Sequence, residues 1–442
     1  MQHLRTIDRV IDLTDPGRNV LYNMTLDEAR ARVASGDAHA VGEIDGQFAL
    51  MATSGVNVLL ARSISRPLRF FIAKRAEGPC LVAADRIDTI HQWLRTQGLA
   101  DQFHPSYTRM VPAHHLMNVA LVGCPDPSPK LTRFFDPPRG GLPADVQAIG
   151  KAYIGALADA VGKWLSTEAK EGPIGVGFSG GIDSGSVFVI AYHTMLRLGM
   201  NPSRLKAFTL SVDGAGEDLA QARSFLDSLG LGLFLEPIEV TASMIDWRRA
   251  VRVVEDYKPL DIQAAAMGLA LGDGIRRRYP EWKYLMDGDG GDENLKDYPI
   301  EDNPELTIRS VLNNSMLYQE GWGVGAIKHS LTYSGGLSRA YARTYAPAAT
   351  AGFSAFSPYA LPRLIGLAEA IPFIELTGWD HENLYRLKGD IVAAGVKAIT
   401  GIDMPIFPKR RFQHGAASKA RFAELFPAQE SAYRQAFHAL YE

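Results

Sequence analysis

The feature that most constrains the fold of this 442-residue chain is the stretch IGVGFSGGIDSGSVFVIAYH, from Ile174 to His193. A short apolar run leads into two adjacent glycines, and apolar residues at helical spacing follow. A glycine-rich turn between a buried strand and a helix gathers the unpaired N–H groups of the first helical turn, where the helix dipole adds positive potential. The pattern therefore predicts an anion-binding turn in an α/β domain.

The side chains of this turn indicate which anion it binds. Gly180 and Gly181 allow the backbone to approach a phosphate, and the hydroxyls of Ser179 and Ser184 add donors. Asp183 would repel a phosphate unless a metal ion lies between them, so we expect a pyrophosphate bound through Mg²⁺, with Asp183 as a ligand. The alternative is a simple tight turn in which Asp183 caps the helix, but the full Ser-Gly-Gly-Ile-Asp-Ser string favours a bound pyrophosphate.

A second polar loop, MDGDGGDEN at residues 286–294, follows another predicted strand. Its acidic side chains are those of Asp287, Asp289, Asp292 and Glu293. Like charges at this density are unfavourable unless solvent or a cation compensates them. A solvated acidic turn is one interpretation. We favour a second set of Mg²⁺ ligands, because the ligands of open parallel sheets bind at the carboxyl ends of the strands.

The distribution of strand and helix patterns predicts two domains. Residues 1–135 contain β-like runs separated by Gly, Pro and Ser, which is typical of an antiparallel sheet; the runs cover 46–52, 57–63, 68–74 and 79–85. The Pro- and Gly-rich residues 136–148 form the expected linker. In residues 149–442 helical patterns separate the predicted strands, which indicates parallel βαβ units; these strands are 174–178, 205–211, 231–238 and 282–287. After Pro299 the pattern is mostly helical.

Composition limits the partners. The chain carries 46 Lys and Arg against 49 Asp and Glu, a net charge of −3, which gives no electrostatic reason to expect nucleic acid or an anionic membrane. Its two cysteines, Cys80 and Cys124, are too few for a disulfide framework or a zinc site. The first residues lack the apolar segment of a signal peptide, and no apolar run is long enough to span a bilayer. We expect a cytoplasmic protein that acts on small molecules, and the sequence leaves a homodimer open.

The two loops resemble those of a known family. Ser-Gly-Gly-Ile-Asp-Ser is similar to the SGGxDS signature of the PP-loop ATP pyrophosphatases, and MDGDGGDEN resembles the SGEGxDE motif of the asparagine synthetase-like family. The resemblance implies cleavage of ATP between its α- and β-phosphates, with Mg²⁺ held by Asp183 and Asp292. It also places the backbone of Gly288 beside the nucleotide and puts Asp289 where the family has Glu.

Two further segments carry the resemblance. FTLSVDG at 208–214 is similar to the strand that contacts adenine in this family, which implies contacts from Leu210 and Val212. PKRRFQHGA at 408–416 is similar to the family's PKxxFxxG stretch. That match implies that Lys409 contacts phosphates and stabilises charge during amide formation; a charged helix end is the alternative for this lysine.

The chain also departs from the family. Its N-terminal part resembles the Ntn-type glutaminase domain, since EIDGQFALMA at 43–52 is similar to LDGxFAFAL. The catalytic N-terminal cysteine of that domain is missing, because the chain starts with Met1 and its first cysteine is Cys80. We therefore expect no glutaminase activity. Ser354 and Phe356 stand where the family has Glu and Arg, which argues against aspartate as the substrate.

Together these patterns predict an α/β protein with a degenerate glutaminase-like, β-rich N-terminal domain and a PP-loop parallel-sheet domain that ends in a helical part. The resemblance implies a ligase that uses ATP and Mg²⁺ to adenylate a small-molecule carboxylate and passes the acyl group to an amine, in specialised-metabolite biosynthesis. The base for the amine is left open among Asp289, Tyr318 and Glu320. An ammonia-dependent primary-amide synthetase and a non-catalytic nucleotide-binding homologue are the alternatives.

Overall fold

The computed structural model describes residues 9–76, 78–122, 124–125, 128–214, 216–298, 300–301, 306–313, 340–407 and 415–442. The chain forms two compact units. The first contains the described residues up to Asp136 together with Phe437–Glu442, and the second contains the described residues from Pro137 to Ala436. Within these ranges, no helix combines the length and the apolar character needed to cross a bilayer.

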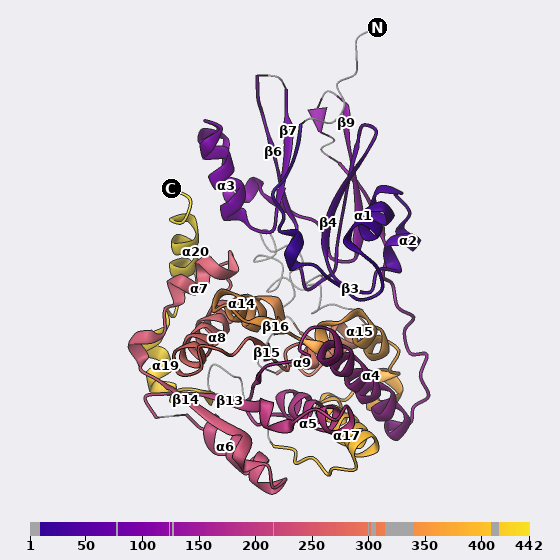
Figure 1. Ribbon diagram of the computed structural model, residues 1–442, viewed down its shortest axis with the longest axis vertical. Helices are drawn as coiled ribbons and strands as arrows, with labels where there is room; N and C mark the ends of the chain where they lie inside the picture. The colour runs from indigo at the N-terminus through magenta and orange to yellow at the C-terminus, as the bar shows by residue number, and fades with distance from the viewer. Residues whose placement is uncertain are drawn as a thin grey trace. The chain divides into compact units, whose positions relative to one another are not determined.

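Among its described residues, the first unit contains two larger β-sheets and one two-stranded sheet (Figure 1). One has the strand order β1 (Val10–Asp12), β7 (Cys80–Ala84), β6 (Arg69–Ala73) and β8 (Arg109–Met110). The other has the order β10 (Cys124–Pro125), β9 (His115–Val122), β5 (Asn57–Arg62) and β4 (Ala49–Ser54), with β11 (Lys130–Arg133) also paired to β9. Two short strands, β2 (Val20–Leu21) and β3 (Gly46–Gln47), pair separately. The predicted antiparallel strands are confirmed for β4 with β5 and for β6 with β7, whereas β1 pairs with β7 in parallel.

Apolar side chains hold this unit together in layers. The inner faces of the two sheets share one core, which includes Met51, Leu60, Phe70 and Leu81. Two helices, α1 (Leu26–Ala34) and α2 (Ala38–Gly42), cover the outer face of the β4–β5–β9 sheet, and α3 (Ile87–Thr96) covers the outer face of the β6–β7 sheet. The described residues of this unit also form the 3-10 turns η1 (Pro16–Arg18), η2 (Ala100–Gln102) and η3 (Pro105–Tyr107). Its assignment to the Ntn-type glutaminase fold stays a prediction.

The second unit is built on a five-stranded parallel sheet. The order is β14 (Leu235–Val240), β13 (Leu205–Val212), β12 (Ile174–Gly177), β15 (Tyr284–Met286) and β16 (Ser354–Phe356). All four predicted strands of this domain are present and parallel. The third begins later than expected because residues 232–234 form a 3-10 turn. The edge strand β16 was not predicted, since the segment after Pro299 was expected to be mostly helical.

Strand order places the functional edge of this sheet. From β12 the chain continues outward to β13 and β14, and it returns to the other side of β12 for β15 and β16. The connections therefore leave the sheet in opposite directions after β12 and before β15, which opens a crevice between them at the carboxyl ends of the strands. Both polar loops follow these two strands, because one starts after Gly177 and the other after Met286.

Helices cover both faces of the sheet (Figure 1). One layer contains the mutually packed helices α4 (Val146–Thr167), α5 (Ile182–Arg197) and α17 (His381–Thr400), with α6 (Asp218–Ser228) beside β13. The other contains α7 (Trp247–Val254), α8 (Pro259–Arg278) and α14 (Ala346–Thr350). The remaining described helices and turns are η4 (Pro202–Arg204), η5 (Gly232–Phe234), η6 (Ala242–Met244), α9 (Gly291–Asn294), α10 (Ile308–Asn313), the π-helix η7 (Tyr341–Tyr345), η8 (Pro358–Ala360), α15 (Pro362–Glu369), α16 (Phe373–Thr377), α19 (Lys419–Leu425) and α20 (Glu430–His438).

Two glycines fix how closely α17 packs on α4. A Cβ atom at Gly395 would lie 2.2 Å from the carbonyl oxygen of Gly150, and a Cβ atom at Gly150 would lie 2.5 Å from the carbonyl oxygen of Ile391. Side chains at either position would therefore push the helices apart. This close approach holds α17 in the same layer as α5, whose N-terminus carries the glycine-rich turn.

Candidate functional site at the carboxyl ends of two neighbouring strands

The first loop joins β12 to α5 as predicted. Gly181 is the N-cap of α5, and no side chain of the described residues caps this helix end, so the N–H groups of its first turn point into the crevice. The loop is held by its own hydroxyls: the backbone N–H of Ser179 donates to Oγ of Ser184 at 3.2 Å, and the N–H of Gly181 donates to Oγ of Ser179 at 3.3 Å. The strand–turn–helix that was predicted is present, and the binding of an anion by this turn stays a prediction.

Glycines are required where this loop meets its neighbours. Gly180 has a φ of +72°, and a Cβ atom there would lie 2.8 Å from the backbone of Ala222. A Cβ atom at Gly288 would lie 2.6 Å from the backbone nitrogen of Ser184, so the second loop rests directly on the first turn of α5. The neighbouring pairing of β12 with β15 produces this contact. Gly288 thus lies against the glycine-rich turn, and its place beside a nucleotide stays a prediction.

The two predicted metal ligands converge on one point, and a lysine occupies it. Nζ of Lys388, on α17, lies 2.6 Å from Oδ2 of Asp183 and 3.3 Å from Oδ2 of Asp297, and it also forms an ion pair with Asp292. The lysine side chain is only 3% exposed. Burial alone would lower its pKa, but Asp183, Asp292 and Asp297 together raise the pKa of Lys388 well above its usual value, so the ammonium stays charged. Sequence reasoning missed this residue.

The carboxylates fit Mg²⁺ in chemistry, while in this structure the ammonium of Lys388 takes the place of a cation between them. Hard carboxylate oxygens are its preferred protein ligands, and Mg²⁺ is commonly held by one or two carboxylates while phosphates and water complete the octahedron. Asp183 and Asp292 face a common point from two loops, as their shared contact with Lys388 shows. Among the described residues, no three His, Cys, Asp or Glu side chains form a ready-made metal cluster. A metal ion here would therefore depend on nucleotide phosphates for its remaining ligands.

A second group of carboxyls, Asp287 and Asp289, lies farther along the acidic loop. Both oxygens of Asp287 accept hydrogen bonds: Oδ2 accepts from the hydroxyl of Ser357 at 2.7 Å, and Oδ1 accepts from the backbone N–H of Asp289 at 3.0 Å. Oδ2 of Asp289 accepts a hydrogen bond of 2.8 Å from the hydroxyl of Thr344. Thr344 belongs to the π-helix η7, a form of helix that recurs at functional sites. Asp289 is partly exposed, whereas Asp287 is buried.

Burial and proximity shift the pKa values of both carboxyls upward. Burial raises the pKa of Asp287 to about 7. Burial, together with repulsion from Asp287 and Glu293, raises the pKa of Asp289 to about 8, although the Arg343 guanidinium and the Thr344 hydroxyl act in the opposite direction. A partly exposed carboxyl with such a pKa can accept and release a proton near neutral pH.

A buried hydrogen-bond network supports the loops from below. The hydroxyls of Ser186 and Tyr359 lie 2.7 Å apart, which connects α5 to η8. Nδ2 of Asn294 donates to the carbonyl oxygen of Tyr359 at 2.9 Å and to the hydroxyl of Tyr153 at 3.0 Å. The rings of Tyr153 and Tyr359 stack with their centroids 5.7 Å apart. These contacts tie α4, α5, α9 and η8 into one support for the acidic loop.

Other predicted residues have different placements. Leu210 and Val212 lie at the carboxyl end of β13 but are only 1% and 0% exposed, so a base beside this strand would contact backbone. Lys409, Tyr318 and Glu320 lie outside the described residues.

Phe356, which stands where the family has Arg, is buried. Its ring is 2% exposed and stacks on Trp164 with the centroids 4.9 Å apart and the planes 7° apart, so it belongs to the core under the sheet. Ser354 starts β16, at the end of the strand away from the loops. The backbone carbonyl of Phe356 accepts a hydrogen bond of 3.2 Å from the N–H of Asp287, and the side chain of this segment that bonds to the acidic loop is that of Ser357. The argument against aspartate as the substrate stays a prediction.

Comparison with known proteins agrees with this geometry. Residues 153–351 match the sequence model of the asparagine synthase family. The chain contains an asparagine synthase domain. The match confirms the resemblance to the asparagine synthetase-like family over both loops and η7, and it ends before Lys388. Members of this family are ATP-dependent ligases. No curated protein matches the chain significantly. The absence of glutaminase activity stays a prediction.

Proposed function

We propose that this protein is an ATP-dependent, AMP-forming carbon–nitrogen ligase. It would adenylate a small-molecule carboxylate, release pyrophosphate, and transfer the acyl group to an amine. The observation that carries the proposal is the convergence of Asp183 and Asp292, from two loops at the switch point of the sheet, beside the open N-terminus of α5. A helix N-terminus and a pair of carboxylates are together suited to a nucleotide triphosphate with Mg²⁺.

In the adenylation step the chain's own groups bind and orient the phosphates. The N–H groups of the Gly181–Ser184 turn and the hydroxyl of Ser179 donate to phosphate oxygens, and the ammonium of Lys388 adds positive charge at the same place. Asp183 and Asp292 would hold Mg²⁺, which supplies charge neutralisation for the departing pyrophosphate. The substrate carboxylate attacks the α-phosphorus and forms an acyl-adenylate as pyrophosphate leaves.

In the second step an amine attacks the acyl carbon, AMP leaves, and the amine must lose a proton. Of the predicted bases, Asp289 is the one that the structure describes. Oδ2 of Asp289 accepts a hydrogen bond from the Thr344 hydroxyl, which fixes the orientation of the carboxyl group, and the partial exposure of the side chain leaves it accessible to a substrate. A pKa raised to about 8 by burial gives this carboxylate more affinity for the amine's proton than an ordinary aspartate has.

The products of ATP turnover test the proposal. With carboxylic acids and amines supplied as mixtures, we expect AMP and pyrophosphate, and we expect Asp183→Asn to lower pyrophosphate exchange at least a hundredfold. The matched control is Asp159→Asn, since Asp159 is exposed on α4 and pairs only at the surface with Arg363. Formation of ADP, or equal exchange in the two variants, would contradict the proposal. Turnover with ammonium alone would indicate a primary-amide synthetase, and ATP binding without exchange would indicate a non-catalytic homologue.

A further inference from the structure

Asp297 is the third carboxylate in contact with the ammonium of Lys388, and it follows the acidic loop of residues 286–294. Its Oδ2 lies 3.3 Å from Nζ of Lys388. Its side chain is 11% exposed, against 20% for Asp183 and 32% for Asp292. Of the three carboxylates, Asp297 is therefore the least accessible to a ligand that enters from solvent.

A strained turn holds Asp297 in this position. Its backbone N–H donates to the carbonyl oxygen of Asp292 at 3.0 Å, which closes the end of α9. Between them Lys296 has a φ of +57°, a left-handed conformation that is unfavourable for any residue with a Cβ atom and persists only where the surroundings maintain it. Nζ of Lys296 is buried 3.7 Å from Oε1 of Glu369 and 5.5 Å from the centre of the Phe373 ring. A second buried ion pair thus maintains the turn that places Asp297.

The charges around Lys388 leave room for a divalent cation without loss of the ammonium. Asp183, Asp292 and Asp297 carry three formal negative charges and Lys388 carries one positive charge, which leaves −2 on the four groups. If Asp183 and Asp292 bind Mg²⁺, the ammonium is repelled from them, yet at 3% exposure it still requires a counter-ion. Asp297 is the carboxylate that remains for it.

We infer that Asp297 is a positioning residue, which retains the ammonium of Lys388 beside the nucleotide when Asp183 and Asp292 bind Mg²⁺. The inference rests on the proposed function. In the free chain the ammonium is shared among three carboxylates, and in the nucleotide complex its pairing with Asp297 becomes the principal one. Without the Asp297 carboxylate, the ammonium competes with Mg²⁺ for the other two.

Nucleotide binding tests the inference without turnover. The probe is α,β-methylene-ATP, which cannot be cleaved between its α- and β-phosphates. With millimolar Mg²⁺, Asp297→Asn should weaken its binding about tenfold or more, because the ammonium then opposes the metal ion. With EDTA instead of Mg²⁺, the same variant should bind the probe at least as tightly as the native chain, because one negative charge near the phosphates is gone. Asp297→Glu, which keeps the charge, should bind nearly as the native chain does. Equal weakening of Asp297→Asn under both conditions would indicate a structural role and overturn the inference.

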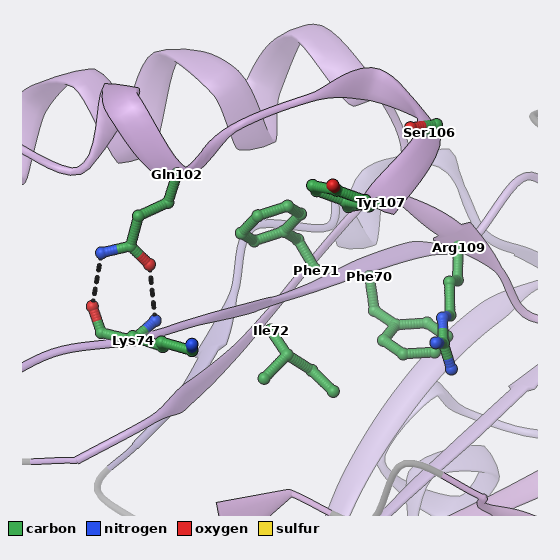
Figure 2. Close-up of a pocket in the computed structure, with 8 residues that line it drawn as sticks. All are labelled: Phe70, Phe71, Ile72, Lys74, Gln102, Ser106, Tyr107 and Arg109. Carbon is green, nitrogen blue, oxygen red and sulfur yellow. Dashed lines mark hydrogen bonds between the residues drawn. The ribbon is translucent and has the colours of Figure 1, made fainter.

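The first unit contains a pocket from which nucleotide binding must be distinguished. This pocket of about 430 Å³ lies at the edge of the β6–β7 sheet, and Figure 2 shows the rings of Phe71 and Tyr107 and the side chain of Lys74 in its lining. Aromatic rings and an ammonium suit an adenine base and a phosphate. Tyr107→Ala, at a side chain 65% exposed, is therefore the control and should bind the probe as the native chain does. Weaker binding by this variant would place the probe away from the loops and overturn the inference.

A double-mutant cycle separates positioning from direct binding of the metal ion. The factor by which Asp297→Asn weakens binding with Mg²⁺ should be about fivefold or more larger in the native chain than in Lys388→Met. Asp403→Asn, which removes the exposed partner of Lys397 on α17, is the matched control and should change neither affinity. Equal factors would overturn the inference and leave the proposed function standing, whereas no Mg²⁺-dependent binding by the native chain would overturn both.

Nuclear magnetic resonance follows the ammonium in the native chain itself. The ¹⁵N signal of Lys388 Nζ should shift when Mg²⁺ and the probe are added, and it should stay visible because a buried, paired ammonium exchanges its protons slowly. Disappearance of the signal in the complex would show that the ammonium moves to solvent, and would overturn the inference.

Discussion

The buried ammonium of Lys388 offers the most direct test of the site's electrostatics. We expect Lys388→Met, which keeps the length of the side chain, to destabilise the second unit strongly. The contacts of Nζ place the oxygens of Asp183 and Asp297 at most about 6 Å apart, with Asp292 beside them. At an effective dielectric constant near 20, two such charges repel by roughly 3 kcal/mol. This repulsion agrees with the loss of about 3–5 kcal/mol that typically follows removal of one partner from a buried ion pair.

The assay is thermal unfolding followed by tryptophan fluorescence, with and without Mg²⁺. A loss of this size should lower Tm by roughly 6 °C or more. Mg²⁺ should restore more stability to Lys388→Met than to the native chain, because the freed carboxylates then bind the ion. Lys397→Met is the matched control: Lys397 lies on the same helix, is 62% exposed, and pairs with Asp403, so its loss should cost less than about 1 kcal/mol. Equal effects of the two substitutions would refute the reasoning.

Three further predictions concern the two loops. Gly288→Ala should abolish ATP binding in equilibrium dialysis, because its Cβ atom would lie 2.6 Å from a backbone nitrogen of α5, whereas Gly141→Ala, where a Cβ atom would meet no described atom within 4 Å, should bind normally. Thr344→Val should raise the pKa of Asp289, measured by ¹³C titration of the carboxyl group, because the lost hydroxyl stabilised the charged form. Thr344→Ser should restore the native pKa of Asp289. Thr350→Val, which loses a comparable hydrogen bond to a backbone carbonyl, should leave that pKa unchanged. Finally, the folded state holds a proton on Asp289 up to about pH 8, whereas an unfolded aspartate releases it near pH 4, so stability should fall as pH rises between these values. In Asp289→Asn the fall should be shallower by up to about 1.4 kcal/mol per pH unit, and an unchanged slope in chemical denaturation would contradict the raised pKa.

Sequence patterns predicted the parts of the fold that depend on residues close together in the chain. The strand–turn–helix around Ser179–Ser184 was predictable because its apolar run, its glycines and its helical spacing all lie within twenty residues. The three-residue strand β16 was missed because a short run that packs against one neighbour has no periodicity to read. The buried place of Phe356 could not be predicted for a related reason: its position in a family motif says nothing about which face of a strand it occupies.

Lys388 shows the limit of such reasoning for the site. It lies 205 residues from Asp183 in a helix where a lysine is normally expected at the surface. Only the packing of α17 on α4 and α5, which Gly150 and Gly395 permit, brings its ammonium to the loops. The roles of Ser357 and Thr344 depended on tertiary contacts in the same way, since each reaches the acidic loop from a distant segment.

The long sequence separation between Lys388 and the loops has a consequence for biosynthesis. During synthesis the β12 and β15 loops leave the ribosome well before α17, so the carboxylates of Asp183 and Asp292 meet before their shared ammonium exists. We expect the nascent chain to keep this edge of the sheet open until α17 docks, so that nucleotide affinity appears only after α17 has emerged. A ribosome-stalled chain ending at residue 378 that binds ATP as tightly as the finished protein would show that the edge closes without the helix.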